Sequence, residues 1–117
     1  MGVGVEARTR EIPASWGKPV QISTLRLQAE PFQVARYPHG VITLSYLGEI
    51  QMIGALDSFR GTSHRGIRAG SSPEALRQQY GTPSRVLHMT QGESWVYEDQ
   101  GIVFQLQQGQ VTSWLLY

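Results

Sequence analysis

The sequence predicts an α+β fold made of two tandem pseudo-symmetric repeats, each an antiparallel β-meander of about four strands with one short helix. Two observations predict this fold. Residues 66–83 begin with a glycine-rich stretch, contain Leu76 and end in Tyr-Gly-Thr-Pro. A similar but less regular segment near the N-terminus ends in Trp-Gly-Lys-Pro at Pro19. A glycine, an apolar run and a second glycine also occur at 40–50 and again at 101–111. Two markers in the same order indicate a duplication.

The repeats divide the chain into a first copy over about 2–56, a linker over 57–65 and a second copy over about 66–117. With 117 residues, the chain has the length of a single compact domain in which the two copies share a core. Three arginines and a histidine gather at residues 60–68. We interpret this stretch as a solvated connection, and a site for an anion or an acidic partner is the alternative.

The second copy contains the clearer helix, which we expect over residues 73–80. Ser72 is a good N-cap, and Pro73 suits the first helical position because its missing N–H costs no hydrogen bond there. Gly81 suits the position just beyond the helix, and Pro83 prevents its continuation.

The rest of the second copy predicts four short strands separated by glycine-containing turns. Trp95 and Tyr97 alternate with smaller residues and therefore share one face of their strand. A meander of this kind is antiparallel, and the helix is available to cover its apolar face. The last strand ends the chain, so we expect it to form a sheet edge that could pair with another copy as a homodimer. The expected strands are 85–90, 94–98, 102–106 and 111–117.

The first copy follows the same plan less regularly. Pro13 falls inside the equivalent helix position, residues 10–16, so only a short helical turn is expected there. The strands are expected at 20–27, 31–36, 40–46 and 49–56. The core candidates in this copy are Leu25, Leu27, Val41, Leu44, Ile50, Met52 and Ile53.

The second copy also carries a spaced set of residues: Gly70-x-Ser72-x-Glu74 with Leu76, Tyr80-Gly81-x-Pro83, Trp95-x-Tyr97, and Phe104 five residues before Gly109-x-Val111. This pattern resembles the small outer-membrane assembly lipoproteins of the SmpA/OmlA (BamE) type. The tandem arrangement is similar to the β-lactamase-inhibitor-protein-like domains, which repeat a related unit. The chain lacks the cysteine that anchors those lipoproteins. The resemblance implies a non-enzymatic role in which a sheet face or loop edge binds another protein.

Composition excludes several classes of function. The absence of cysteine excludes disulfides, thiolate metal ligands and cysteine nucleophiles. A net charge of +1 provides no general attraction to nucleic acid. No apolar run approaches the roughly 20 residues of a membrane-spanning helix. No signal peptide is visible, so we expect a soluble protein without membrane insertion. The sequence leaves its compartment open and favours the cytoplasm.

The polar residues form no catalytic or metal-binding pattern. The three histidines, His39, His64 and His88, lack the spacing of a helical metal pair, and no Gly-x-Ser-x-Gly motif is present. We therefore expect no enzyme, no metal and no cofactor. An enzyme would gain support if one histidine converged with a carboxylate within hydrogen-bond reach.

The predicted function is a non-catalytic protein-binding or assembly module with an unidentified protein partner. The aromatic candidates are core residues in one interpretation and exposed anchors of an interface in the other. One alternative function is a small-ligand binder with an aromatic-lined cleft between the two repeats. Another is an enzyme of unknown class. The candidate partner-binding residues are Arg60, Arg65, Arg68, Trp95, Tyr97 and Trp114.

Overall fold

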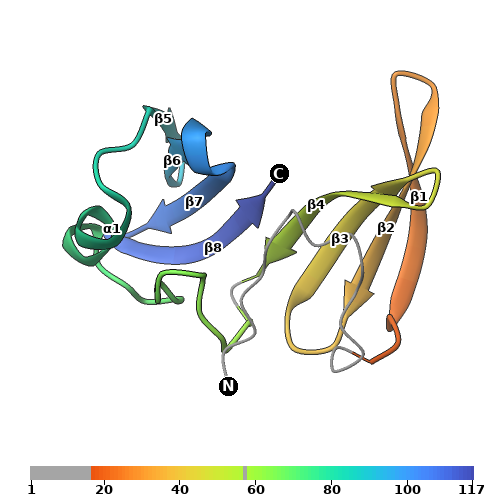
Figure 1. The fold of residues 1–117 in the computed structure, drawn as a ribbon, viewed down its shortest axis with the longest axis horizontal. Helices are drawn as coiled ribbons and strands as arrows, with labels where there is room; N and C mark the ends of the chain where they lie inside the picture. Colours follow the sequence, from red (N-terminus) through yellow and green to blue (C-terminus); the bar gives the residue numbers. More distant parts are fainter. Residues whose placement is uncertain (1–16, 57) are drawn as a thin grey trace.

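A computed structural model describes residues 17–56 and 58–117, which form one continuous antiparallel sheet of eight strands (Figure 1). The strand order is β1-β2-β3-β4-β8-β7-β6-β5. β4 and β8 therefore meet in the middle of the sheet, and β1 and β5 form its edges. The strands are β1 (Gln21–Leu27), β2 (Glu30–Tyr37), β3 (Val41–Tyr46), β4 (Glu49–Ala55), β5 (Arg85–Met89), β6 (Gly92–Tyr97), β7 (Ile102–Gln107) and β8 (Gln110–Leu116).

Tight hairpin turns explain why neighbouring strands in the sequence pair with each other. Four loops consist of two residues: 28–29, 47–48, 90–91 and 108–109. In all of these except 90–91, both residues have positive φ. This is the requirement of a type I′ turn, whose twist matches that of the flanking antiparallel strands.

The predicted helix is confirmed as α1 (Pro73–Tyr80), with the expected signals at both ends. The hydroxyl oxygen of Ser72 accepts a hydrogen bond from the N–H of Ala75 at 3.1 Å. At the other end, the N–H of Gly81 donates to the carbonyl oxygen of Arg77 at 2.8 Å. A single 3₁₀ turn, η2 (Glu98–Gln100), connects β6 to β7.

The core lies on one face of the sheet, along two lines of cross-strand partners. Partners in register share a face, so each line runs straight across the strands. Both lines cross the junction between β4 and β8 without a break. The described core is therefore continuous over both halves of the chain. The first line is Tyr97, Ile102, Leu116, Ile53 and Thr43, and the second is Trp95, Phe104, Trp114, Ala55 and Val41, all buried.

The predicted fold class, two α+β repeats each with its own helix, is wrong. The described part of the chain is 52% strand and 11% helical, and its eight strands form a single sheet with one α-helix. Backbone pairing of Ile53, Gly54 and Ala55 with β8 makes one sheet out of the two expected meanders. The helical turn expected at residues 10–16 lies outside the described residues.

Individual elements were predicted more accurately than their assembly. All eight strands are present within two residues of their expected bounds. The last strand, however, was expected at a sheet edge and lies in the interior as β8. Among the core candidates, Val41, Ile50 and Ile53 are buried. Leu44 and Met52 are half-buried, while Leu25 and Leu27 are 43% and 40% exposed on the edge strand β1.

Within residues 17–56 and 58–117, no helix has both the length and the apolar character needed to cross a membrane.

Replacing Gly40 by a residue with a side chain is predicted to destabilise the fold, because the backbone at Phe59 approaches Gly40 closely. A Cβ at Gly40 would lie 2.5 Å from the backbone nitrogen of Phe59, whereas a Cβ at Gly48 would meet nothing within 4 Å. Both glycines have positive φ, +84° and +81°, so alanine carries a similar backbone strain of about 1–2 kcal/mol at either site. Gly40→Ala should cost about 1–3 kcal/mol more than Gly48→Ala, the usual range for overpacking. Urea unfolding of both variants measures the difference, and equal losses would contradict the close approach.

Candidate functional site

The face of the sheet opposite the core presents a second line of apolar residues. Val96, Val103, Leu115, Gly54 and Ile42 are successive partners across β6, β7, β8, β4 and β3. The next line on the same face includes Val34, Leu44 and Met52 as partners on β2, β3 and β4. We call this surface the open face and define it by six half-buried residues: Val34, Ile42, Leu44, Met52, Val103 and Leu115.

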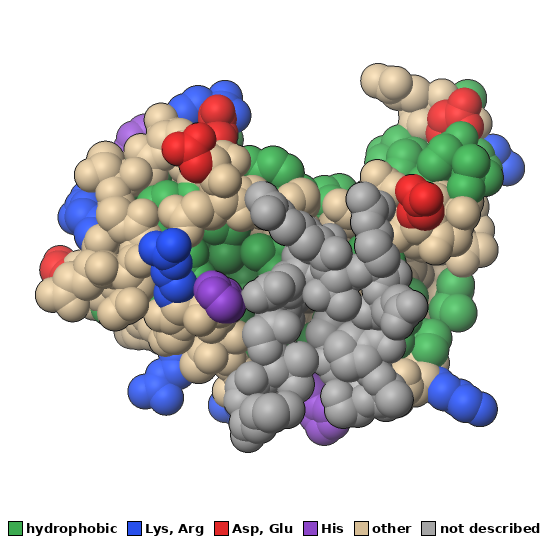
Figure 2. All heavy atoms as spheres, viewed as in Figure 1, with side chains coloured by type: hydrophobic (Ala, Val, Ile, Leu, Met, Phe, Trp, Pro, Cys, Tyr) green, Lys and Arg blue, Asp and Glu red, His purple; other side chains and the backbone are tan. Residues whose placement is uncertain are grey.

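The open face continues into apolar side chains that are more exposed at both sheet edges. Leu87 and Met89 on β5 are 46% and 60% exposed, and Leu25 and Leu27 lie on β1 at the other edge. Figure 2 shows hydrophobic side chains reaching the surface along the outer strands of the N-terminal half. Helix α1 packs on the core face instead, because the ring of Tyr80 contacts those of Tyr97 and Phe104. Within the described residues, no helix covers the open face.

Gly54 shapes the centre of the open face. A Cβ at this position would lie 2.8 Å from Cγ2 of Ile42 and 3.6 Å from Cδ1 of Leu115. Without a side chain at Gly54, those two residues approach one another over β4. The apolar surface therefore remains unbroken where the two halves of the sheet meet.

The aromatic candidates for partner binding are core residues, which is the first of the two interpretations that the sequence left open. Trp95, Tyr97 and Trp114 are each at most 3% exposed. Trp114 packs between Phe59 and Phe104, with ring centroids 5.6 and 6.1 Å away. These side chains are buried because the segment after β4 and helix α1 both cover the face on which they lie.

The segment that joins β4 to α1 contributes buried side chains to the core, while its arginines and histidine are exposed, as in a solvated connection. Phe59, Ser63 and Ile67 are 7%, 3% and 1% exposed. The hydroxyl of Tyr80 donates a 2.8 Å hydrogen bond to the hydroxyl oxygen of Ser63, which also accepts from the N–H of Ile67 at 3.1 Å. The buried hydroxyl of Ser63 thereby connects the turn before α1 to Tyr80 at the end of that helix.

Arg65 is held by this helix rather than displayed to a partner. Its guanidinium donates to the carbonyl oxygen of Gln79 at 3.0 Å and lies 5.5 Å from the centre of the Tyr80 ring. A cation near the C-terminal carbonyls of a helix is favoured by the helix dipole. Arg65 therefore stabilises the segment that joins β4 to α1.

The remaining predicted arginines, Arg60 and Arg68, come together at one surface hollow. The hollow has a volume of about 500 Å³. Both arginines are exposed, and neither forms an ion pair within the described residues. We call this feature the arginine hollow, lined by Phe59, Arg60, Arg68, Ala69, Gly70 and Ser71.

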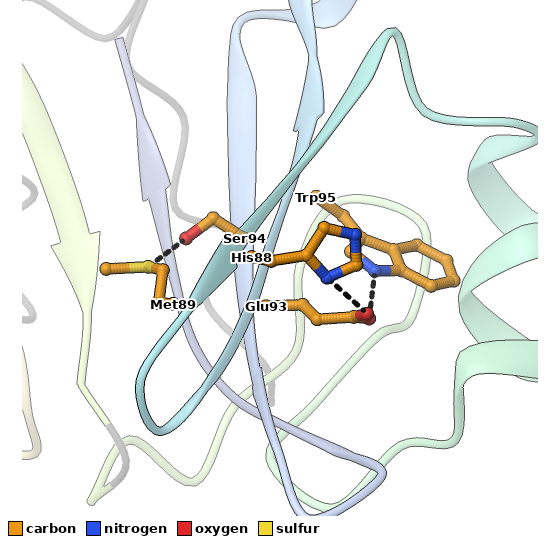
Figure 3. A network of polar contacts seen from close by, with 5 residues as sticks. All are labelled: His88, Met89, Glu93, Ser94 and Trp95. Carbon is orange, nitrogen blue, oxygen red and sulfur yellow. Dashed lines mark hydrogen bonds and ion pairs between the residues drawn. The ribbon is translucent and has the colours of Figure 1, made fainter.

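A polar network on β5 and β6 brings one histidine to a carboxylate (Figure 3). Nδ1 of His88 lies 3.3 Å from Oε2 of Glu93, and the indole N–H of Trp95 donates to Oε1 of Glu93 at 3.0 Å. The side chains of His88 and Glu93 are 78% and 39% exposed. Ser94, the neighbouring hydroxyl, points to the other face beside Met89. The network therefore has the geometry of an ordinary cross-strand pair, and no nucleophile of the described residues is hydrogen-bonded to His88.

His88 thus meets the distance condition set above for an enzyme. The enzyme hypothesis stays a prediction. His39 occupies a turn with φ of 71°. In the part of the chain that the structure describes, no group of three or more His, Cys, Asp or Glu residues could hold a metal ion.

The small-ligand alternative required an aromatic-lined cleft between two sheets. β4 and β8 are instead paired neighbours in one sheet, and the aromatic rings pack against each other in its core. The arginine hollow is a different kind of site, with a polar lining and only Phe59 from the aromatic residues.

Sequence reasoning missed the open face, whose residues were assigned to the core or left unassigned. A signal for it was present: β7 reads Ile-Val-Phe and β8 reads Trp-Leu-Leu, so apolar residues occupy both faces of these strands. Strands that are apolar on both faces have two surfaces to cover.

Comparison with known proteins gives no relatives: the chain matches no family model, no curated protein and no solved structure. The resemblance to the BamE-type lipoproteins is neither supported nor opposed by this result and stays a prediction. The function must therefore be inferred from the residues of this chain.

Tyr80→Phe is expected to loosen the segment before α1. The substitution removes the hydroxyl that donates to Ser63 and leaves the buried serine oxygen with one partner fewer. Loss of a buried hydrogen bond costs about 1–3 kcal/mol. Urea unfolding measures the cost, with Tyr117→Phe at the 48% exposed C-terminal residue as control. Equal stability of the two variants would show that the Ser63 contact contributes nothing.

Stability is expected to fall in alkaline solution partly through Tyr97. Burial raises the pKa of Tyr97, and the nearby Arg77 opposes the rise only in part. Between the ordinary tyrosine pKa of about 10 and this raised pKa, the unfolded chain loses a proton that the folded chain keeps. The free energy of unfolding therefore decreases as pH rises through that interval. Tyr97→Phe should flatten the decrease seen by chemical unfolding above about pH 10, and an unchanged decrease in this variant would contradict the prediction.

Proposed function

We propose that this protein is a non-catalytic module that binds another protein through the open face of its sheet. The observation that carries the proposal is the line of apolar residues that crosses the strands opposite the core. Val103, Leu115 and Ile42 on this line are half-buried. Extended apolar surfaces on a folded protein mark sites of interaction.

The lateral extent of this surface suits a protein partner better than a small ligand. It reaches from Leu25 on the edge strand β1 to Leu87 on the edge strand β5, and so spans the width of the sheet. Stable protein interfaces bury about 800 Å² on each partner, an area on the scale of a sheet face. A small ligand is enclosed by a cavity instead.

Charge on the open face indicates the chemistry of the partner. Arg36 continues the line beyond Ile42 and is exposed, without an ion pair within the described residues. Arg85, at the other end of the line, is already paired with Glu98 at 2.9 Å. The partner surface that would fit the open face is therefore apolar at its centre and has a carboxylate at the edge that contacts Arg36.

Self-association is the competing use of the same half of the molecule. All seven residues of β1 are exposed, so this edge strand is available to pair with a strand of a second copy. A homodimer of this kind would hydrogen-bond through the β1 backbone and would not require the open face.

Two matched pairs of variants test the proposal. Leu25→Glu and Leu87→Glu place a charge on the open face, whereas Ile22→Glu and Val86→Glu place it on the same strands facing the other way. All four side chains are at least 37% exposed, so the variants should fold. The measurement is quantitative mass spectrometry of proteins captured from an extract of the source cells.

A partner of the open face should be recovered at least tenfold less with either open-face variant and unchanged with either control, because a buried unpaired charge costs several kcal/mol. The proposal fails if every captured protein responds equally to both members of each pair. Light scattering of the unmodified protein separates the competing case: a dimer that survives Leu87→Glu points to the β1 edge.

A further inference from the structure

The arginine hollow combines two cations with a rigid backbone frame. The N–H of Arg68 donates to the hydroxyl oxygen of Ser71 at 3.1 Å, and the N–H of Ser71 donates back to the carbonyl oxygen of Arg68 at 3.0 Å. Gly70 and Ser71 are in turn tied to Val111 of β8 by hydrogen bonds of 2.7 and 2.9 Å. The loop that carries Arg68 is thereby anchored to the sheet just after this arginine.

The opposite wall is anchored as well. Arg60 follows Phe59, whose buried ring packs edge-on against Trp114 with centroids 5.6 Å apart. Two guanidinium groups are therefore carried by backbone that the core holds in place, although the groups themselves are exposed. Such pre-organisation reduces the entropy that a ligand loses on binding.

Among the described residues, the charges of the arginine hollow have no counter-ion. None of its lining residues is a carboxylate. Three other arginines have partners: Arg85 pairs with Glu98, Arg65 bonds to Gln79, and the guanidinium of Arg77 lies 4.7 Å from the centre of the Trp95 ring. Helix α1 also begins just after Ser71, and the partial positive charge of a helix N-terminus has the same sign as the arginines.

We propose that the arginine hollow binds a phosphate group. Within the described residues the Ser71 hydroxyl accepts from Arg68 and donates to no partner, so its proton is available. Together with two guanidinium forks it offers more donors than the two oxygens of a carboxylate can use. A phosphate dianion supplies the additional oxygens and the second charge. The volume of about 500 Å³ leaves room for the remainder of a phosphate ester. This site does not depend on the open face.

The test is a titration of the whole chain with inorganic phosphate, O-phosphoserine and acetate at constant ionic strength. Binding is followed by calorimetry and by the ¹⁵N side-chain resonances of the arginines. The variants are Arg60→Gln and Arg68→Gln, each tested separately, so that one folded member of the pair is sufficient. Arg26→Gln is the control, because Arg26 is exposed on β1 and unpaired within the described residues.

We expect saturable phosphate binding that shifts the Arg60 and Arg68 side-chain resonances and weakens about tenfold or more in either variant, as when a charged hydrogen bond is lost. Arg26→Gln should bind as the unmodified chain does. If O-phosphoserine binds more tightly, the ligand of the arginine hollow is a phosphate ester. If inorganic phosphate binds more tightly, the ligand is the free ion. The proposal is overturned if acetate binds equally well, if Arg26→Gln is as weak as the other variants, or if no saturable binding occurs.

Discussion

The pairing of β4 with β8 is the constraint on which the rest of this structure depends. Only three residue pairs form it, from Ile53–Leu116 to Ala55–Trp114. They convert the free edges of two four-stranded meanders into the centre of one sheet, and so remove two edges that would otherwise expose unpaired backbone groups. The same pairs align the core lines on one face and the open-face line on the other. One short ladder thus creates both the continuous core and the candidate binding surface.

The core face is covered by the chain segment between the two halves. Phe59, Ser63 and Ile67 come from residues that look polar and basic in the sequence, yet they are buried beside Trp114 and Tyr80. Their burial orients the arginines of the same segment outward. Trp114 still carries a cost, because its indole N–H has no hydrogen-bond partner within the described residues. An unmade hydrogen bond of this kind costs about 1–3 kcal/mol, which the burial of a large aromatic surface offsets.

The two candidate sites follow from what the core leaves uncovered. The open face remains because the single described α-helix packs on the other side of the sheet, against Tyr97 and Phe104. The arginine hollow remains because the backbone around Arg68 is hydrogen-bonded to β8, while its side chain has no acidic neighbour among the described residues. In both cases a backbone held by hydrogen bonds presents side chains that lack packing or charge partners among the described residues. Incomplete interactions on a rigid frame are what a partner or ligand can satisfy.

The local structure of this protein was readable from its sequence, because turns, caps and strand alternation depend on neighbouring residues. Ser72, Pro73 and Gly81 determine where α1 begins and ends. Two-residue turns determine which neighbouring strands pair as hairpins. Faces and edges were not readable in this way. Trp95 and Tyr97 could equally have been exposed anchors, and the strand now called β8 was expected at an edge. Arg60, Arg65 and Arg68 look alike in sequence, yet one caps a helix and two line a hollow. Only the long-range pairing of β4 with β8 decided these roles, because it selects which residues are covered and which remain in contact with water.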